Sequence, residues 1–405
     1  MKDKNENRPG YKKTKVGWIP EGWESPRIEE ICGMKSGQSI TSISISRNAQ
    51  YPCFGGNGLR GYTSKFTHDG QYILIGRQCA LSGNVHIVAD KFFASEHAIV
   101  VTVSPKSSLF WLAELLNYKQ LNRYTEASAQ PGLSVNKILR IRVPLPPLPE
   151  QKKIAEILST WDEAIEQTRS LIKAKKKRKK GLMQQLLTGK TRLPGFATSA
   201  SRIKYKYYDL PVDWECVQIK DVAQERVIRN NENRKIVVYA CSKYQGFVKS
   251  LEYFDRQIYS KDTSAYKFVK NNWFGFPANH IEEGSIGLFT DNIGIVSPIY
   301  IVFSMNKSVY PSYMYAVYKT MTYKHIFSVS TNASVNRRGS LRWNNFSLIR
   351  IPLPPLPEQK AIAEVLTTAD DEIALLEETL SFYEKQKRGL MQKLLTGEVR
   401  VFDVS

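Results

Sequence analysis

The chain has 405 residues, of which 42% are hydrophobic and 11% aromatic, and it carries a formal net charge of +20 at pH 7. This length predicts two or three domains, and the composition can bury ordinary cores, which excludes a globally disordered chain. No apolar run approaches membrane-spanning length and residues 1–15 are polar and basic, so we expect a cytoplasmic protein without membrane contacts.

The positive charge is distributed unevenly along the chain. It amounts to +8 in residues 1–143, +7 in 144–200 and +9 in 201–351, whereas residues 352–405 carry −4. Such a field attracts polyanions, and nucleic acid is the main candidate. A generally basic soluble protein is the alternative that charge alone leaves open.

Cysteines and histidines are scattered, and no two cysteines form a C-x-x-C pair. Neither a disulfide framework nor a structural zinc site is indicated, and we expect no metal or cofactor in this chain.

Each half of the chain begins with a similar segment and continues as a mixed α/β globule. GWIPEGWESPRIEEI at residues 17–31 resembles YDLPVDWECVQIKDV at 208–222, sharing P-x-x-W. In the first half, the runs at 72–76, 84–89 and 98–103 are typical of strands, and 108–124 has helical spacing.

The second half repeats this order with different side chains. Strand-like runs at 235–241, 285–290 and 298–304 precede a helical stretch at 312–327. The halves share their ends and differ in the middle, as expected if each middle binds a different ligand.

A long stretch is written twice at an offset of 208 residues. PLPPLPEQKKIAEIL at 144–158 returns as PLPPLPEQKAIAEVL at 352–366 with 13 of 15 positions identical, and GLMQQLLTG at 181–189 returns as GLMQKLLTG at 389–397. The prolines predict a stiff extended joint, and Glu150 and Gln151 then open a helix. A PxxP peptide ligand is the disfavoured alternative, because it would not require the following helix in fixed register.

The helices after each joint carry apolar side chains at alternating steps of three and four. In the first copy these are Ile154, Leu158, Trp161, Ile165, Ile172, Leu182 and Leu186. In the second copy they are Ile362, Leu366, Ile373, Leu376, Leu380, Leu390 and Leu394. This heptad seam predicts that the two helices pack on each other or on partner helices.

The linker at 190–202 has 13 residues and spans at most about 45 Å, so we place the second globule near the far end of the first helix. The expected fold is α+β: two mixed α/β domains at opposite ends of a pair of long antiparallel helices, related by a pseudo-two-fold internal repeat. The expected boundaries are 1–143, 144–200, 201–351 and 352–405.

Catalytic motifs are not evident. TGKT at 188–191 lacks the upstream glycine and strand of a P-loop, and EQK at each joint lacks the acidic partner of a metal-dependent nuclease. The basic run KAKKKRKK at 173–180 is consistent with contacts to DNA phosphates, with an acidic partner, or with a solvated helix face.

Two divergent α/β regions, each entered through P-x-x-W and left through PLPPLPEQ, an I-A-E-hydrophobic-Leu helix and GLMQ-x-LLTG, resemble the specificity (S) subunit of Type I restriction–modification enzymes. The resemblance covers nearly the whole chain. It implies that each globule is a target recognition domain reading one half of a bipartite double-stranded DNA site, while the helices set the unread gap.

The resemblance also implies partners. Two modification (methyltransferase) subunits would dock on the repeats, and two restriction (translocase/nuclease) subunits would join the complex. S-adenosylmethionine, ATP and Mg would belong to these subunits, and this chain would be non-catalytic.

Candidate DNA contacts follow from polar side chains in glycine-rich or basic segments. In the first globule they are Asn57, Arg60, Tyr62, Arg77 and Gln130. In the second they are Lys243, Gln245, Arg337, Arg338 and Arg342. An individual arginine contacts phosphate more often than a base, and the glycines are equally consistent with tight turns. A stand-alone DNA-binding regulator and a DNA-independent adaptor are the competing functions.

Overall fold

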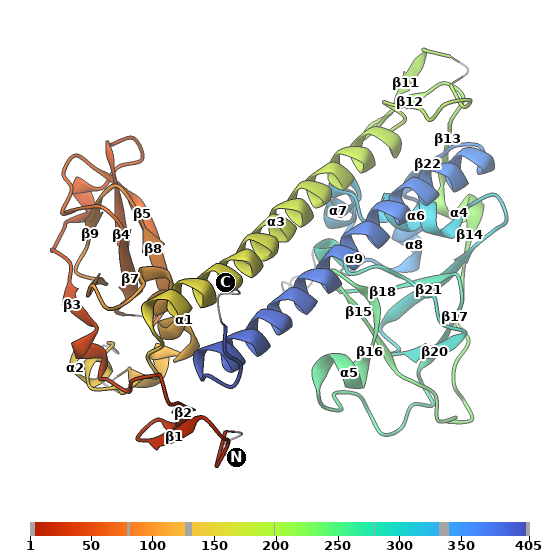
Figure 1. Cartoon of the computed structure of the whole chain (residues 1–405). Helices are drawn as coiled ribbons and strands as arrows, with labels where there is room; N and C mark the ends of the chain where they lie inside the picture. Colours follow the sequence, from red (N-terminus) through yellow and green to blue (C-terminus); the bar gives the residue numbers. More distant parts are fainter. Residues whose placement is uncertain are drawn as a thin grey trace. The chain divides into compact units, whose positions relative to one another are not determined.

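The computed structural model describes residues 5–78, 82–125, 132–197, 199–279, 281–331 and 340–401. It divides into two compact units: unit 1 comprises Met1–Ser170 and Glu378–Ser405, and unit 2 comprises Leu171–Glu377. Each unit therefore combines one globule with part of both long helices, α3 (Leu148–Leu186) and α9 (Leu356–Leu395), which Figure 1 traces as continuous ribbons.

The globule of unit 1 is built on an antiparallel sheet of order β3-β10-β7-β8. Its strands are β3 (Cys32–Ser36), β10 (Ala98–Val103), β7 (Tyr72–Gly76) and β8 (Val85–Val88). The β-branched run of β10 suits a central strand, and the strands predicted at 72–76 and 98–103 are confirmed. Helix α1 (Leu109–Tyr118) packs on this sheet through Trp111, Leu112 and Leu116.

A second sheet of unit 1 has the order β5-β4-β9-β6, with β4 and β9 parallel. Its strands are β4 (Tyr51–Gly55), β5 (Gly58–Thr63), β9 (Lys91–Ala94) and β6 (His68–Asp69). An N-terminal hairpin joins β1 (Tyr11–Thr14) to β2 (Gly17–Pro20), and α2 (Val135–Leu139) precedes the joint. The glycine-rich segment 54–62 forms most of the β4–β5 hairpin, whose two-residue turn is Gly56–Asn57.

Unit 2 has a sheet of the same order and the same antiparallel pairing, β14-β21-β18-β19. Its strands are β14 (Ala223–Glu225), β21 (Tyr300–Met305), β18 (Trp273–Pro277) and β19 (Gly287–Leu288). Two-stranded pairs are β15 (Tyr239–Ser242) with β16 (Gly246–Lys249), β17 (Lys267–Lys270) with β20 (Ile293–Val296), β11 (Arg202–Lys204) with β12 (Asp209–Pro211), and β13 (Glu215–Gln218) with β22 (Arg350–Leu353). The strands predicted at 235–241 and 285–290 are therefore much shorter than expected.

Both predicted globular helices are interrupted. The stretch 108–124 leaves α-helix after Tyr118, because Gln120 adopts φ 50° and a 3₁₀ turn follows at Leu121–Tyr124. The stretch 312–327 is divided into α6 (Pro311–Tyr318) and α7 (Met321–Ser330), and the Thr320 hydroxyl caps α7. The remaining short helices of unit 2 are α4 (Ile219–Val222), α5 (Ser250–Phe254) and α8 (Trp343–Phe346).

The proline joints are extended, as predicted. Leu145 forms a bridge with Glu24, and α3 begins at Leu148, two residues before the expected Glu150. Within unit 1 the start of α3 runs antiparallel to the end of α9, and within unit 2 the end of α3 runs antiparallel to the start of α9. Ion pairs between the helices agree with this direction in each unit: Asp162 with Lys387 in unit 1 and Asp370 with Lys179 in unit 2.

The predicted seam side chains lie buried or half-buried. Ile154 and Leu158 join the core of unit 1, together with Leu394. Leu186, Ile362 and Leu366 join the core of unit 2. Ile165, Ile172 and Ile373 are also buried, whereas Trp161, Leu182, Leu376, Leu380 and Leu390 are half-buried. The seam thus faces a globule as well as a helix, because the globular core extends onto the first turns after each joint.

Candidate nucleic-acid interface and the junctions that support it

Five of the ten candidate readers lie on two hairpins, which occupy the same topological position in the two units. The β4–β5 hairpin lies between β3 and β7 in the chain, and the β15–β16 hairpin lies between the equivalent strands β14 and β18. Asn57 is exposed in the first turn, and Arg60 and Tyr62 follow on β5. Lys243 and Gln245 are exposed in the second turn. The two hairpins therefore present different polar side chains from equivalent positions.

Two further candidates lie away from the hairpin tips. Arg77 follows β7, where its Nη1 donates to the Ser36 hydroxyl at 3.1 Å. Arg342 is exposed at the start of α8 and lines a cavity of about 480 Å³ together with Trp343 and Asn344. Gln130, Arg337 and Arg338 lie outside the described residues. DNA contact by any of these residues stays a prediction.

A half-buried lysine contacts the second hairpin. Lys319 Nζ donates to the Lys243 carbonyl at 3.1 Å and to the Gly284 carbonyl at 3.0 Å. Burial lowers the pKa of Lys319. The lysine therefore links the turn that carries the exposed Lys243 side chain to the end of α6.

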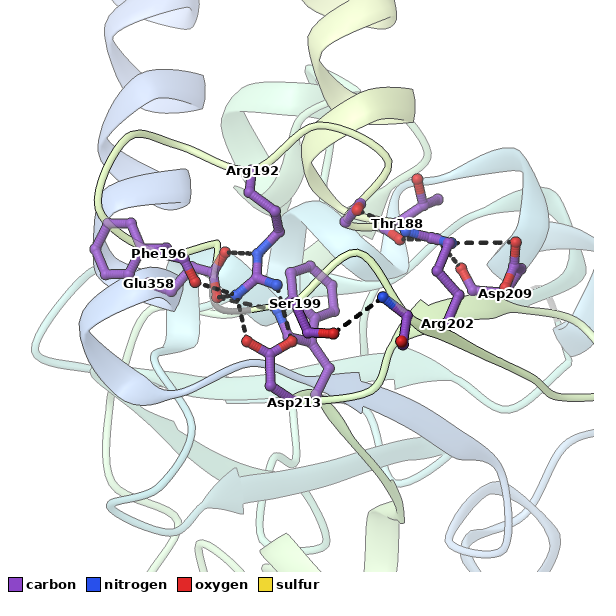
Figure 2. A network of polar contacts seen from close by, with 11 residues as sticks. Thr188, Arg192, Phe196, Ser199, Arg202, Asp209, Asp213 and Glu358 are labelled. Atoms are coloured by element: carbon purple, nitrogen blue, oxygen red, sulfur yellow. Dashed lines mark hydrogen bonds and ion pairs between the residues drawn. The ribbon is translucent and has the colours of Figure 1, made fainter.

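A buried ion-pair network joins the globule of unit 2 to α9 (Figure 2). Arg192 Nε donates to Glu358 Oε1 at 2.6 Å, and its Nη1 donates to Asp213 Oδ1 at 2.8 Å. Glu358 also accepts from Trp214 Nε1 at 3.0 Å. Burial opposes the charged guanidinium, but hydrogen bonds and ion pairs with Asp213 and Glu358 outweigh it and raise the pKa of Arg192.

Unit 1 contains the same junction, completed by the other copy of the repeat. Glu150 accepts from Trp23 Nε1 at 2.9 Å, from Arg400 Nε at 2.7 Å and from Arg400 Nη2 at 2.9 Å. Arg400 and Arg192 are 208 residues apart, as are Glu150 and Glu358. Each globule is therefore held by the start of its own helix and by the tail that follows the other helix.

The glutamine of each PLPPLPEQ motif fastens the joint to the globule. Gln151 Oε1 accepts from the Ser108 backbone N–H at 2.8 Å, and Gln359 Oε1 accepts from that of Tyr310 at 2.8 Å. Each amide nitrogen donates back to its own joint, to Pro146 and Pro354 respectively, at 2.8 Å. The identical Glu-Gln pair thus fixes the direction in which the helix leaves the globule.

Glycines in the two duplicated tails allow a close approach. Gly189 has φ +60°, and a Cβ on it would meet Pro211 at 2.5 Å; Gly397 has φ +73° and would meet Pro20 at 2.5 Å. The P-x-x-W segment and the LLTG tail are therefore complementary surfaces. Sequence reasoning missed Arg192 and Arg400, although each arginine lies three residues after the glycine of an LLTG motif, at the repeat offset of 208 residues.

The basic run is partly neutralised by α9 within unit 2. Lys175, Lys176 and Lys179 pair with Glu372, Glu377 and Asp370 respectively. Elsewhere in the run, Lys177 and Lys180 are exposed and form no ion pair with the described residues. These pairs account for part of the difference in net charge between the two repeats, because acidic residues of the second repeat form ion pairs with lysines of the first.

A carboxylate without an equivalent in unit 2 connects α1 to both long helices in unit 1. Lys387 Nζ lies 3.0 Å from Glu114 Oε2 and 2.6 Å from Asp162 Oδ2. Burial raises the pKa of Glu114 to about 7, with Asp162 adding to the shift and Lys387 opposing it. The cluster carries two carboxylates for one lysine.

In the part of the chain that the structure describes, no three His, Cys, Asp or Glu side chains gather as a metal site. None of the described helices combines the length and apolar character that a membrane crossing requires.

The fold and the paired junctions define a protein with two similar α/β modules, each completed by the other repeat. A family model for the Type I restriction modification DNA specificity domain matches residues 20–175 and 211–381. The two matches cover most of the chain, so the chain belongs to this family and carries two such domains. The resemblance inferred from the motifs is confirmed.

Known relatives agree with this assignment. The chain is 26% identical to the Type I restriction enzyme MjaVIII specificity subunit of Methanocaldococcus jannaschii, over 95% of this chain and 94% of that protein. It is 43% identical to the EcoprrI specificity subunit of Escherichia coli over 139 residues, which span 35% of that relative. The S subunit of M. genitalium has the same fold, with TM-score 0.61 at 16% identity over 92% of this chain and 96% of that one.

Proposed function

We propose that this chain is the non-catalytic DNA-recognition subunit of a Type I restriction–modification complex. Each globule reads one half of a bipartite site, and the paired helices set the length of the unread gap. The observation that carries the proposal is the pair of equivalent hairpins, which present Asn57, Arg60 and Tyr62 in one unit and Lys243 and Gln245 in the other. Equivalent scaffolds with different readers suit two different half-sites.

Linkage of two readers adds affinity without new contacts. Once one half-site is bound, the second reader is held near its own half-site at a high effective concentration. The buried junctions support this role, because Glu150 and Glu358 connect each globule rigidly to the helices that set the gap.

The partners follow from the same proposal. Two modification subunits dock on the duplicated helices and supply S-adenosylmethionine-dependent adenine methylation, and two restriction subunits supply ATP- and Mg-dependent translocation and cleavage. The relative whose structure concerns complex assembly of the type I R-M system, with TM-score 0.51 over 94% of this chain, supports assembly with other subunits.

The test is adenine methylation mapped by single-molecule sequencing in cells with and without this gene. Loss of one bipartite motif on deletion is the expected result. An unchanged methylome in cells with an active modification subunit contradicts the proposal. A stand-alone regulator would bind its site equally tightly without the partners, and an adaptor would show no salt-dependent DNA affinity.

A further inference from the structure

We propose that the charges between α3 and α9 specify pairing of unlike helices, so that each repeat selects the other repeat and rejects its own kind. Because the repeat offset is 208 residues, every pair of positions in contact between the helices of one unit has a counterpart pair of positions in the other unit. Comparing the two members of each pair separates contacts that set register from contacts that choose a partner.

In one duplicated ion pair, the acidic and the basic residue occupy the same repeat positions in both units. Asp162 pairs with Lys387 in unit 1, and the counterparts Asp370 and Lys179 pair in unit 2. This contact would form equally well between two copies of α3 or two copies of α9. It therefore fixes antiparallel register without choosing the partner.

In a second duplicated ion pair, the acidic and the basic residue exchange repeat positions between the units. In unit 1, Arg169 Nη2 lies 2.6 Å from Glu384 Oε1. The counterpart positions in unit 2 hold Glu377 and Lys176, with Lys176 Nζ 2.6 Å from Glu377 Oε1. The basic residue of one helix thus always faces an acidic residue of the other.

Pairing of like helices in the same register would convert both attractions into repulsions. Two α3 helices would place Arg169 opposite Lys176 twice, and two α9 helices would place Glu377 opposite Glu384 twice. Charged pairs flanking a helix–helix seam choose partners in this way, by repulsion in the wrong pair as well as attraction in the right one.

Two further contacts between α3 and α9 could not form in a pair of identical helices. Lys175 pairs with Glu372 in unit 2, whereas the counterpart positions in unit 1 hold Tyr383 and Ala164. Trp161 and Tyr383 pack edge to face in unit 1, with ring centroids 5.7 Å apart. In a pair of α3 helices Lys175 would face Trp161 and Ala164 and would lose its carboxylate.

The consequence rests on the proposed function. Unlike pairing always combines the first reader with the second, which a bipartite site with two different halves requires. Like pairing between two chains would bring two identical readers onto one helix pair. The surface therefore fits the helix of the opposite repeat as its partner.

The test uses three full-length chains of equal net charge. The two-substitution chain carries Arg169→Glu and Glu377→Arg. Both contacts between α3 and α9 then become repulsive, whereas the same contacts in an α3–α3 or α9–α9 pair become attractive. A four-substitution chain carries Arg169→Glu, Glu384→Arg, Lys176→Glu and Glu377→Lys. In this chain the contacts between α3 and α9 are attractive again, with the signs of the charges exchanged. Dimer fraction and melting temperature are measured by light scattering and calorimetry at about 50 mM and 0.5 M salt.

The two-substitution chain should show a roughly tenfold higher dimer-to-monomer ratio at low salt, or a lower melting temperature, than the unsubstituted chain. The four-substitution chain and high salt should both reverse the effect. Equal behaviour of all three chains at low salt overturns the inference. A bipartite methylation motif retained by the four-substitution chain shows that the proposed function stands independently of that outcome.

Discussion

The arginine–glutamate junction shows how single residues position each reader. The Glu358 side chain is fully buried, and that of Arg192 is 8% exposed, so neither charge has water as an alternative partner. In unit 1 the Arg400 side chain is 24% exposed, and Gly22 stands where unit 2 has Asp213. The two junctions are equivalent in plan but differ in burial, and the buried one should depend more strongly on its arginine.

Arg192→Ala should lower the free energy of unfolding of unit 2 by about 3–5 kcal/mol, because it leaves Glu358 buried without its cation. Arg400→Ala should cost clearly less in unit 1. Chemical denaturation with hydrogen exchange resolved by unit measures both losses. Equal losses below about 1 kcal/mol would show that the junction is not a buried ion pair in solution.

Glu114 should make stability depend on pH near neutrality. Its pKa is raised to about 7 from an ordinary value of 4.5, so the folded chain holds this proton more tightly than the unfolded chain. Stability contributed by this group is therefore present at low pH and is lost as the pH rises toward and through about 7. Melting temperatures between about pH 5 and 8 should fall less in Glu114→Gln than in the unsubstituted chain; parallel curves would contradict the assignment.

The long helices show which features of an element could be predicted from sequence. Period and joint were predictable, because heptad spacing and prolines act locally along the chain. The antiparallel direction was predictable from the short reach of the 13-residue linker. The helix interruptions at Gln120 and Thr320 could not be predicted, because ordinary polar residues stand at both positions. The junction arginines required knowing which tail meets which globule. The hairpin of Tyr51–Gly55 and Gly58–Thr63, by contrast, carries a local signal in its Gly56–Asn57 turn.

Duplicated glycines in the helices offer a matched comparison. A Cβ on Gly181 or Gly389 would meet nothing within 4 Å, whereas one on Gly189 would meet Pro211 at 2.5 Å. Gly181→Ala should therefore stabilise the isolated chain by about 0.5–1 kcal/mol, and Gly389→Ala likewise. Gly189→Ala should destabilise unit 2 because of both the contact and its left-handed backbone. Calorimetry that gave the same sign for Gly181 and Gly189 would contradict this packing.

Exposed basic residues recur at equivalent positions on the two long helices. Lys177 and Lys180 correspond to Lys385 and Arg388, and all four are exposed. If they contact DNA phosphates, alanine at all four positions should weaken binding of the full complex equally across DNA sequences. The slope of log affinity against log salt should fall by about one per lost phosphate contact. An unchanged slope with impaired subunit assembly would instead indicate an acidic protein partner.

At the scale of the whole molecule, two units share a sheet order, a hairpin position and a junction, while their readers differ. The internal repeat predicted this organisation, since shared ends and divergent middles are visible without a structure. The identity of each base contact was not predictable in the same way. Readout depends on side-chain geometry at hairpin turns, and turn sequences such as those at Asn57 and Lys243 are compatible with many side-chain directions.

In the proposed function the two globules read their half-sites independently, while the helices set the gap between them and dock the partner subunits. Replacing residues 17–143 with the corresponding region of another family member, followed by methylome sequencing, tests it most directly. The account predicts a new motif in which one half changes while the other half and the gap length are retained. A change in both halves, or in the gap, would contradict it.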